Sequence, residues 1–136
     1  MKKVLTPVLV LLCAAALLAG CATPSPYRPT EVKNVSIRIC DVSPTGATLV
    51  IQDTNDTPYI YGEWYQVEQE RNGDWYALDT VIDNYGFHAI GYTPNGKGEI
   101  EFEIDWEWLY GKLPAGQYRI LKQVDRQYIS VTFTLD

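Results

Sequence analysis

Short runs of alternating apolar and polar residues dominate the chain from residue 34 onward. The run EIEFEIDW, residues 99–106, alternates apolar and acidic residues along almost its whole length. Successive side chains of a β-strand point to opposite faces, so this spacing predicts strands that bury one face. No segment of useful length after residue 34 has the spacing of an amphipathic helix. We therefore predict strands over 35–39, 47–53, 59–70, 74–79, 86–90, 99–106, 116–124 and 128–136.

Turn signals separate these runs about every ten residues. The tetrapeptide SPTG, residues 43–46, combines a proline that presets the dihedral with a glycine that closes a turn. Asn72-Gly73 is the strongest hairpin signal, because both residues tolerate positive φ. Seven to eight short antiparallel strands at this spacing predict an all-β, immunoglobulin-like β-sandwich. A closed barrel is the structural alternative.

The segment DWEWLYGKLPAGQYR, residues 105–119, is the densest aromatic stretch. We predict a short helical turn near 106–111 and a chain reversal at LPAG, residues 113–116. Tyr118 then lies where sandwich domains place a tyrosine corner, whose hydroxyl bonds back to the upstream backbone. The predicted structural corner consists of Trp106, Leu113 and Tyr118. The alternative interpretation is a platform that stacks against a ligand, and Trp108 cannot share one face of a helical turn with Trp106.

Three segments resemble a known family. VSPTGATLVIQDTND, YGEWYQVEQERNGDWYAL and WEWLYGKLPAGQYRILKQV are similar to a bacterial immunoglobulin-like domain family. That family occurs in lipoproteins and other surface proteins, mainly of Gram-positive Firmicutes. The resemblance covers nearly all of residues 34–136. It implies a β-sandwich at the cell exterior with no known enzymatic activity, and it carries over no catalytic or binding residues.

The N-terminus has the pattern of a bacterial lipoprotein signal. Lys2 and Lys3 precede an apolar run over residues 4–18, which is too short and wrongly flanked for a membrane span. The run ends in LAGC, residues 18–21, which resembles a lipobox. This predicts a signal peptide over 1–20, lipidation of Cys21, and anchoring on the extracytoplasmic face of the cell membrane. An ordinary secretory signal is the alternative.

Residues 21–33 form the predicted linker between the anchor and a domain over 34–136. The segment ATPSPYRPTEVKN, residues 22–34, contains three prolines, which favour polyproline II and resist helix. At about 3.1 Å per residue, such a stretch reaches on the order of 40 Å. We therefore expect a disordered tether that lifts the domain off the lipid surface.

Charge and cysteine content argue against a nucleic-acid partner and against a disulfide in the domain. The chain has a net charge of -6, and without Lys2 and Lys3 nine basic residues face seventeen acidic ones, which gives −8. This balance argues against nucleic acid as a partner. Cys13 leaves with the signal and Cys21 carries lipid, so Cys40 has no partner for a disulfide. We expect Cys40 to be a half-buried structural thiol on a strand.

Signals for catalysis and metal binding are weak. His88 is the one histidine, and no serine or cysteine motif accompanies it. The stretch DTNDT, residues 53–57, lacks the glycine and distal glutamate of a calcium loop and is typical of an Asx turn. Nothing fixes a carboxylate pair for glycoside hydrolysis. We predict a protein that is not an enzyme, with no metal site and no cofactor.

A candidate binding patch follows from the hairpin around Asn72-Gly73. A two-residue turn places Arg71 opposite Asp74 and Glu70 opposite Trp75. If Val67 faces the core, the other face forms an outward patch, and exposed aromatic residues rimmed by polar groups often mark interaction sites. The alternative is that a loop such as 79–85 covers the tryptophans. The predicted patch consists of Trp64, Glu68, Glu70 and Trp75.

These patterns predict a membrane-anchored extracytoplasmic lipoprotein with a non-catalytic interaction or structural module. Its predicted partners are the membrane, through the N-terminal lipid, and an unidentified extracellular protein or glycan. A carbohydrate or cell-wall binding module that uses exposed aromatic residues is the main alternative. A secreted enzyme inhibitor, which needs an exposed rigid loop, is a further one.

Overall fold

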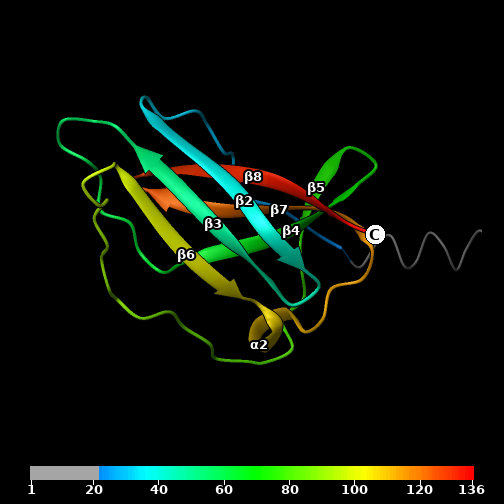
Figure 1. The fold of residues 1–136 in the computed structure, drawn as a ribbon. Helices are drawn as coiled ribbons and strands as arrows, with labels where there is room; N and C mark the ends of the chain where they lie inside the picture. The colour runs from blue at the N-terminus through cyan, green and yellow to red at the C-terminus, as the bar shows by residue number, and fades with distance from the viewer. Residues whose placement is uncertain (1–21) are drawn as a thin grey trace, which may run out of the picture.

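The protein folds into two antiparallel β-sheets that pack face to face (Figure 1). The computed structural model describes residues 22–136, so Cys21 and the apolar segment before it lie outside the described residues. One sheet has the strand order β1-β5-β4-β7-β8 and the other has β2-β3-β6. The bounds are β1 (Thr23–Pro24), β2 (Val35–Ser43), β3 (Gly46–Asp53), β4 (Tyr65–Arg71), β5 (Asp74–Ala77), β6 (Glu99–Asp105), α2 (Glu107–Tyr110), β7 (Gly116–Val124) and β8 (Gln127–Leu135).

The predicted all-β sandwich of seven to eight strands is confirmed. Both sheets keep free edges, so the chain is an open sandwich and not a closed barrel. The short helical turn predicted near 106–111 is α2. None of the helical structure described in residues 22–136 is long and apolar enough to cross a membrane.

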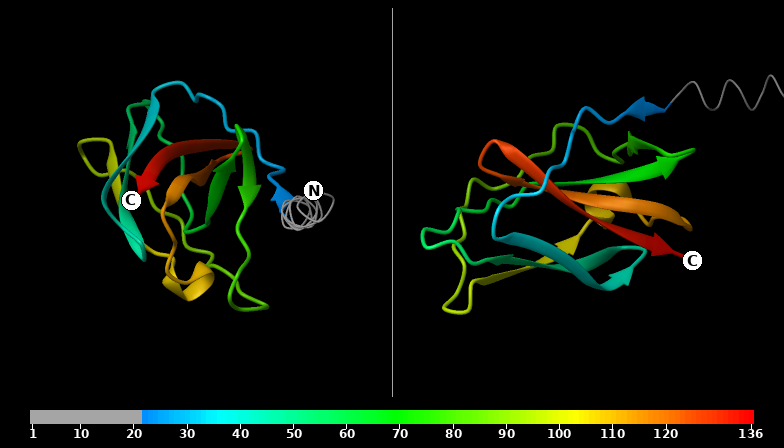
Figure 2. Two further views of the ribbon diagram at one scale, coloured as in Figure 1. Left: turned by 90° about the vertical axis from the view of Figure 1, so that its right-hand side faces the viewer. Right: turned by 90° about the horizontal axis from the view of Figure 1, so that it is seen from above.

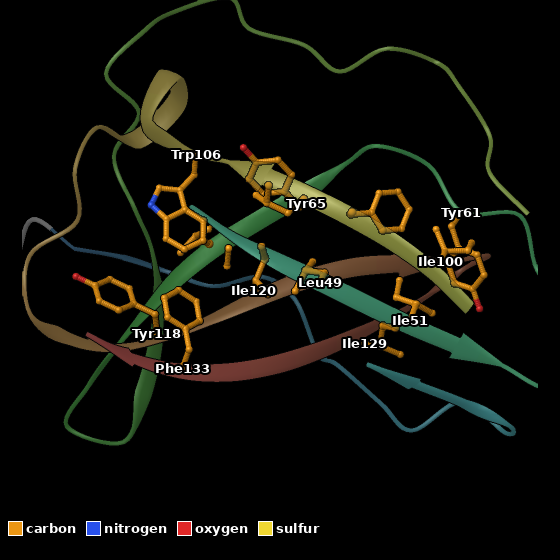
Figure 3. Close-up of a cluster of buried hydrophobic side chains, with 14 of the residues drawn as sticks. Leu49, Ile51, Tyr61, Tyr65, Ile100, Trp106, Tyr118, Ile120, Ile129 and Phe133 are labelled. Atoms are coloured by element: carbon orange, nitrogen blue, oxygen red, sulfur yellow. The ribbon is translucent and has the colours of Figure 1, made fainter. Parts of the chain in front are cut away.

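The alternating runs build the core between the sheets (Figure 3). In β6, Ile100, Phe102 and Ile104 are buried, whereas Glu101 and Glu103 are exposed. The same alternation makes each sheet amphipathic, and burial of the apolar faces stabilises the sandwich. The largest core side chains come from both sheets and from the loops at their ends.

Two predicted strands differ from the structure. Residues 59–64 precede β4 as a loop, in which Tyr61 forms an isolated bridge with Tyr92. The carboxylate of Asp53 accepts hydrogen bonds from the Tyr59 amide and the Tyr61 hydroxyl, both at 2.8 Å, and this holds the loop away from a strand path. Residues 86–90 also form no strand, and within residues 22–136 no strand pairs with the outer edge of β6.

The hairpin register around Asn72-Gly73 agrees with the prediction. Arg71 pairs with Asp74, and Glu70 pairs with Trp75. Asn72 has φ 53 and Gly73 has φ 86, which are the positive values that a type I′ turn requires. The turn residues therefore have the conformation that the observed pairing of β4 with β5 requires.

The proline-rich segment is part of the domain and not a free tether. Thr23 and Pro24 pair with Ala77 and Tyr76 of β5, so the segment extends the larger sheet (Figure 2). Farther along, the Thr30 amide donates to the Tyr128 carbonyl at 2.8 Å. Apolar side chains in the segment pack against the sandwich, and this burial and the main-chain bonds outweigh the freedom of an extended linker.

Cys40 also differs from expectation. Its side chain lies on β2 and is exposed, not half-buried. Strand β2 is an edge strand of the smaller sheet, and Cys40 follows the partly buried Ile39 on the opposite face. The alternation of side chains along the strand therefore directs the thiol to solvent.

Candidate functional site

The predicted structural corner closes one end of the sandwich. The Tyr118 hydroxyl donates to the Pro114 carbonyl at 2.7 Å, which is the geometry of a tyrosine corner. The indole Nε1 of Trp106 donates to the Pro44 carbonyl at 2.9 Å. Both rings stack on Phe133, with centroid distances of 5.4 and 5.5 Å (Figure 3). Since Trp106 and Tyr118 are fully buried and bonded, they pack the core and offer no platform to a ligand.

The structure buries one member of the predicted binding patch completely. Glu68 accepts hydrogen bonds from the guanidinium of Arg119 at 2.7 and 2.8 Å and from the side-chain amide of Gln66 at 2.9 Å. The same guanidinium lies 4.6 Å from the ring centre of Trp75 and contacts the Ser25 hydroxyl. Glu68 is therefore a buried ion-pair partner, and the prediction that it belongs to an exposed patch is wrong.

The patch tryptophans are half-buried beneath the proline-rich segment. Tyr27 packs its ring against Trp64 and Tyr128, with centroid distances of 5.5 and 4.8 Å. The Ser25 amide donates to the Trp75 carbonyl at 2.9 Å. The contacts with this face thus come from residues of the proline-rich segment, whereas the alternative expected them from the loop 79–85. Among the four patch residues, only Glu70 is exposed.

A second aromatic surface lies beside β6 and the start of β4. We call it the aromatic cleft, a hollow of about 580 Å³ between β6 and the long segment that joins β5 to β6. Figure 1 shows this segment running along the outer side of β6 toward α2. The lining residues are Glu63, Tyr65, Gly86, Phe87, His88, Tyr92, Glu101, Phe102, Glu103, Ile104, Asp105 and Trp108.

Aromatic rings form the wall of the cleft near α2. Phe87 meets Tyr65 and Trp108 edge to face, at centroid distances of 5.2 and 5.8 Å, and Tyr85 packs against Trp108 at 6.3 Å. Trp108 remains 40% exposed and Tyr85 46% exposed. A hydrogen bond from the Val81 amide to the Leu109 carbonyl fastens this part of the long segment to α2. Large apolar rings held open to solvent are typical of interaction surfaces.

Carboxylates line the other part of the cleft. Glu63 accepts a hydrogen bond from the Tyr92 hydroxyl at 2.8 Å, which holds its side chain in place and raises the pKa of Tyr92. Glu101 and Glu103 are exposed along β6. His88 is exposed at the rim, and the lining contains no serine or cysteine that could act as its nucleophile partner. The cleft combines aromatic faces with negative charge, which is typical of a site that binds a ligand. Covalent catalysis would need a nucleophile paired with a base, and the lining offers no such pair.

Comparison with known proteins identifies the fold family. The model of the bacterial Ig-like domain matches residues 31–134. The chain belongs to the bacterial Ig-like domain family. This membership indicates a non-catalytic surface or interaction module. No curated protein and no solved structure matches the chain.

The topology of this Ig-like domain explains why the cleft exists. In immunoglobulin-like domains the strands A, B, E and D form one sheet. By order and pairing, β2, β3 and β6 take the places of A, B and E. The segment between β5 and β6 makes no strand beside β6, so the position of strand D stays open. The cleft lies at this open position.

A buried lysine contacts Phe102, one of the residues that line the cleft. Lys122 is fully buried in the Ig-like domain, its ammonium group donates to the Gly62 carbonyl, and it lies 4.0 Å from the ring centre of Phe102. Burial lowers the pKa of Lys122 to about 8, although the nearby Glu63 carboxylate acts in the opposite direction. Lys122 is absent from the cleft lining, so its charge affects the stability of the wall and not a ligand directly.

The DTNDT stretch organises a loop of the Ig-like domain. One oxygen of Asp53 accepts from the backbone and side-chain amides of Asn55, and the other accepts from Tyr59 and Tyr61. Burial raises the pKa of Asp53, but these hydrogen bonds outweigh it and hold the pKa below its usual value. Within the described residues, no group of three histidine, cysteine or acidic side chains could hold a metal ion.

The predicted patch and the aromatic cleft differ in how clearly the sequence indicates them. The register of one hairpin predicts the patch, but it carries no information on the segment that covers the outer face. The cleft residues come from β4 and the loop before it, β6, α2 and the long segment, so the sequence does not bring them together. A usable signal was the presence of Tyr85, Phe87 and Ile90 in a stretch otherwise rich in Gly, Asn and Asp. Apolar residues in an irregular loop need a packing or binding partner.

Proposed function

We propose that the protein is an extracytoplasmic lipoprotein, anchored through Cys21, whose Ig-like domain binds an extracellular partner through the aromatic cleft. The observation that carries the binding role is the exposure of Trp108 on the cleft wall, where the rings of Phe87 and the neighbouring Tyr85 hold it in place. A rigid aromatic anchor loses little entropy on binding, and it favours contact with a protein or a sugar ring.

The anchoring part of the proposal is supported by the sequence before the domain. The basic start, the apolar run and LAGC end at Cys21, one residue before the described part of the chain. A Cys21→Ala variant is expected to incorporate no labelled fatty acid and to stay unprocessed, whereas Cys40→Ala, the matched control, is labelled and processed as the wild type is. Equal labelling of Cys21→Ala and the wild type would refute lipid anchoring.

The binding part is tested with the full-length protein in detergent micelles on arrays of surface proteins and cell-wall glycans. Trp108→Ala removes the exposed anchor of the cleft, and Ile60→Ala removes a side chain that is 68% exposed and lies outside the cleft. We expect a partner bound by the wild type to lose at least tenfold in affinity with Trp108→Ala and to be unaffected by Ile60→Ala. A partner that binds both variants equally well does not use the cleft.

A glycan is the second candidate partner. The adjacent Trp108 and Tyr85 rings and the carboxylates Glu101 and Glu103 could stack against and hydrogen-bond a sugar. This candidate uses the rings of the cleft and not those of Trp64 and Trp75. Glycan binding that survives Trp108→Ala would count against this candidate.

A further inference from the structure

The direction of the main-chain groups in β6 can be read from its hydrogen bonds. The Trp106 amide donates to the Thr45 carbonyl at 3.0 Å, and the Asp53 amide donates to the Gly98 carbonyl at 2.8 Å. Residues 98 and 106 therefore direct their main chain toward β3. Because this direction alternates along an antiparallel strand, Glu101 and Glu103 direct their amides and carbonyls toward the opposite, outer edge.

The two ends of that outer edge have partners, and its middle does not. The Glu99 carbonyl accepts from the Asn95 amide at 2.9 Å, and the Asp105 carbonyl accepts from the Tyr65 hydroxyl at 3.1 Å. Between these bonds, none of the hydrogen bonds formed by residues 22–136 reaches the main chain of Glu101 or Glu103. Both residues line the aromatic cleft, so an unpaired strand edge borders the cleft.

We propose that the cleft binds an extended basic peptide, which pairs with β6 as an added strand in the open position of strand D. This inference rests on the proposed binding role of the cleft and specifies its ligand. The amides and carbonyls of Glu101 and Glu103 repeat at roughly 6.8 Å, the two-residue repeat of a β-strand. A peptide backbone matches this spacing of donors and acceptors, as in other cases of strand addition.

The side chains of the added strand follow from its alternation. Those on one face lie beside the exposed carboxylates of Glu101 and Glu103, where lysine or arginine forms cross-strand pairs. Those on the other face lie against the rings of the cleft, where apolar or aromatic residues pack. The net negative charge of the domain also attracts a basic segment. The structure thus assigns a ligand pattern in which basic and apolar residues alternate.

A random dodecapeptide library displayed on phage tests this pattern against the full-length protein in detergent micelles. We expect enrichment of peptides with lysine or arginine at every second position and apolar residues between. The most enriched peptide is then synthesised and measured by fluorescence anisotropy. Glu101→Gln/Glu103→Gln should weaken its binding about fivefold to tenfold. The matched control Glu31→Gln/Asp56→Asn makes the same change in charge outside the cleft and should leave the affinity unchanged.

Backbone N-methylation separates strand addition from simple charge attraction. Methyl groups on the edge-facing amides of the peptide should weaken binding about tenfold, whereas methyl groups on the alternate amides should have little effect. Equal effects of the two methylation patterns, or enrichment without alternation, would overturn the inference. If no peptide is enriched but a glycan binds and is lost with Trp108→Ala, the peptide assignment fails and the binding role of the cleft stands. If neither binds, both fail.

Discussion

Lys122→Met tests whether a buried charge weakens the wall of the cleft. Lys122 is fully buried on β7, with its ammonium group against the Phe102 ring and the Gly62 carbonyl. Methionine has a similar length and keeps the contact with Phe102, but it carries no charge. Because Gly62 is exposed, its carbonyl can accept a hydrogen bond from water when the lysine is removed. The variant therefore removes mainly the cost of desolvating the charge.

The expected change in the free energy of unfolding follows from the pKa of Lys122. Burial lowers the pKa of Lys122 from 10.5 to about 8. Each pKa unit corresponds to about 1.4 kcal/mol, so the charged form is disfavoured in the folded state by about 3 kcal/mol. Loss of the bond to Gly62 costs about 1 kcal/mol. At pH 7 we therefore expect Lys122→Met to be more stable than the wild type by about 2 kcal/mol.

The pH dependence has a definite sign. Between pH 8 and pH 10.5 the unfolded chain binds a proton at Lys122 that the folded chain has lost. Stability then rises with pH, by about 2 kcal/mol between pH 7 and pH 9.5. Tyrosines act in the opposite direction at higher pH, because burial raises the pKa of Tyr65 to about 12 and raises that of Tyr110 as well. Their stabilising contribution is lost above pH 10.

Urea unfolding of residues 22–136, followed by tryptophan fluorescence at several pH values from 7 to 9.5, measures both effects. The wild type should gain stability across this range, and Lys122→Met should not. Lys97→Met, which replaces an exposed lysine, should behave as the wild type does. Parallel curves for the wild type and Lys122→Met would show that the amine is not desolvated, and the reasoning would be refuted.

Four further substitutions test the corner and the buried ion pair by urea unfolding. Tyr118→Phe removes the hydrogen bond to Pro114 and should cost about 1–2 kcal/mol, so an unchanged midpoint would contradict a tyrosine corner. Trp106→Ala should cost about 3–5 kcal/mol, because it leaves a cavity beside Phe133, and a loss below about 1 kcal/mol would contradict its core position. Arg119→Met should cost about 3–5 kcal/mol by leaving Glu68 buried without its partner, and a second change, Glu68→Gln, should recover part of it.

Local patterns predicted the features of the fold that depend on neighbouring residues. The positive φ values of Asn72 and Gly73 fix the β4–β5 register, and alternation in 99–106 identifies the buried face of β6. The chain reversal before Tyr118 was also readable, because a proline and a glycine stand beside a tyrosine that needs a bonding partner. In each case the determining contacts lie within a few residues of one another.

Long-range contacts explain what the sequence did not reveal. The predicted linker, residues 21–33, has the composition of a free tether, yet Tyr27 packs against Trp64 and Tyr128, which are far away in sequence. The strand predicted over 59–70 is shortened by Asp53, whose carboxylate binds the loop from another sheet. Strand propensity cannot anticipate such partners, because they are set by tertiary packing.

The glutamates of β6 serve two purposes in this structure. Charged side chains on an edge strand disfavour pairing with a second copy of the same acidic chain. Glu101 and Glu103 provide such protection at the edge where strand D is missing. The same charges attract a basic strand, so protection against self-association and selection of a partner arise from one pair of residues. Because an irregular segment replaces strand D, β6 keeps an unpaired edge. Its negative charge disfavours pairing with a second copy of the domain and favours pairing with a basic peptide.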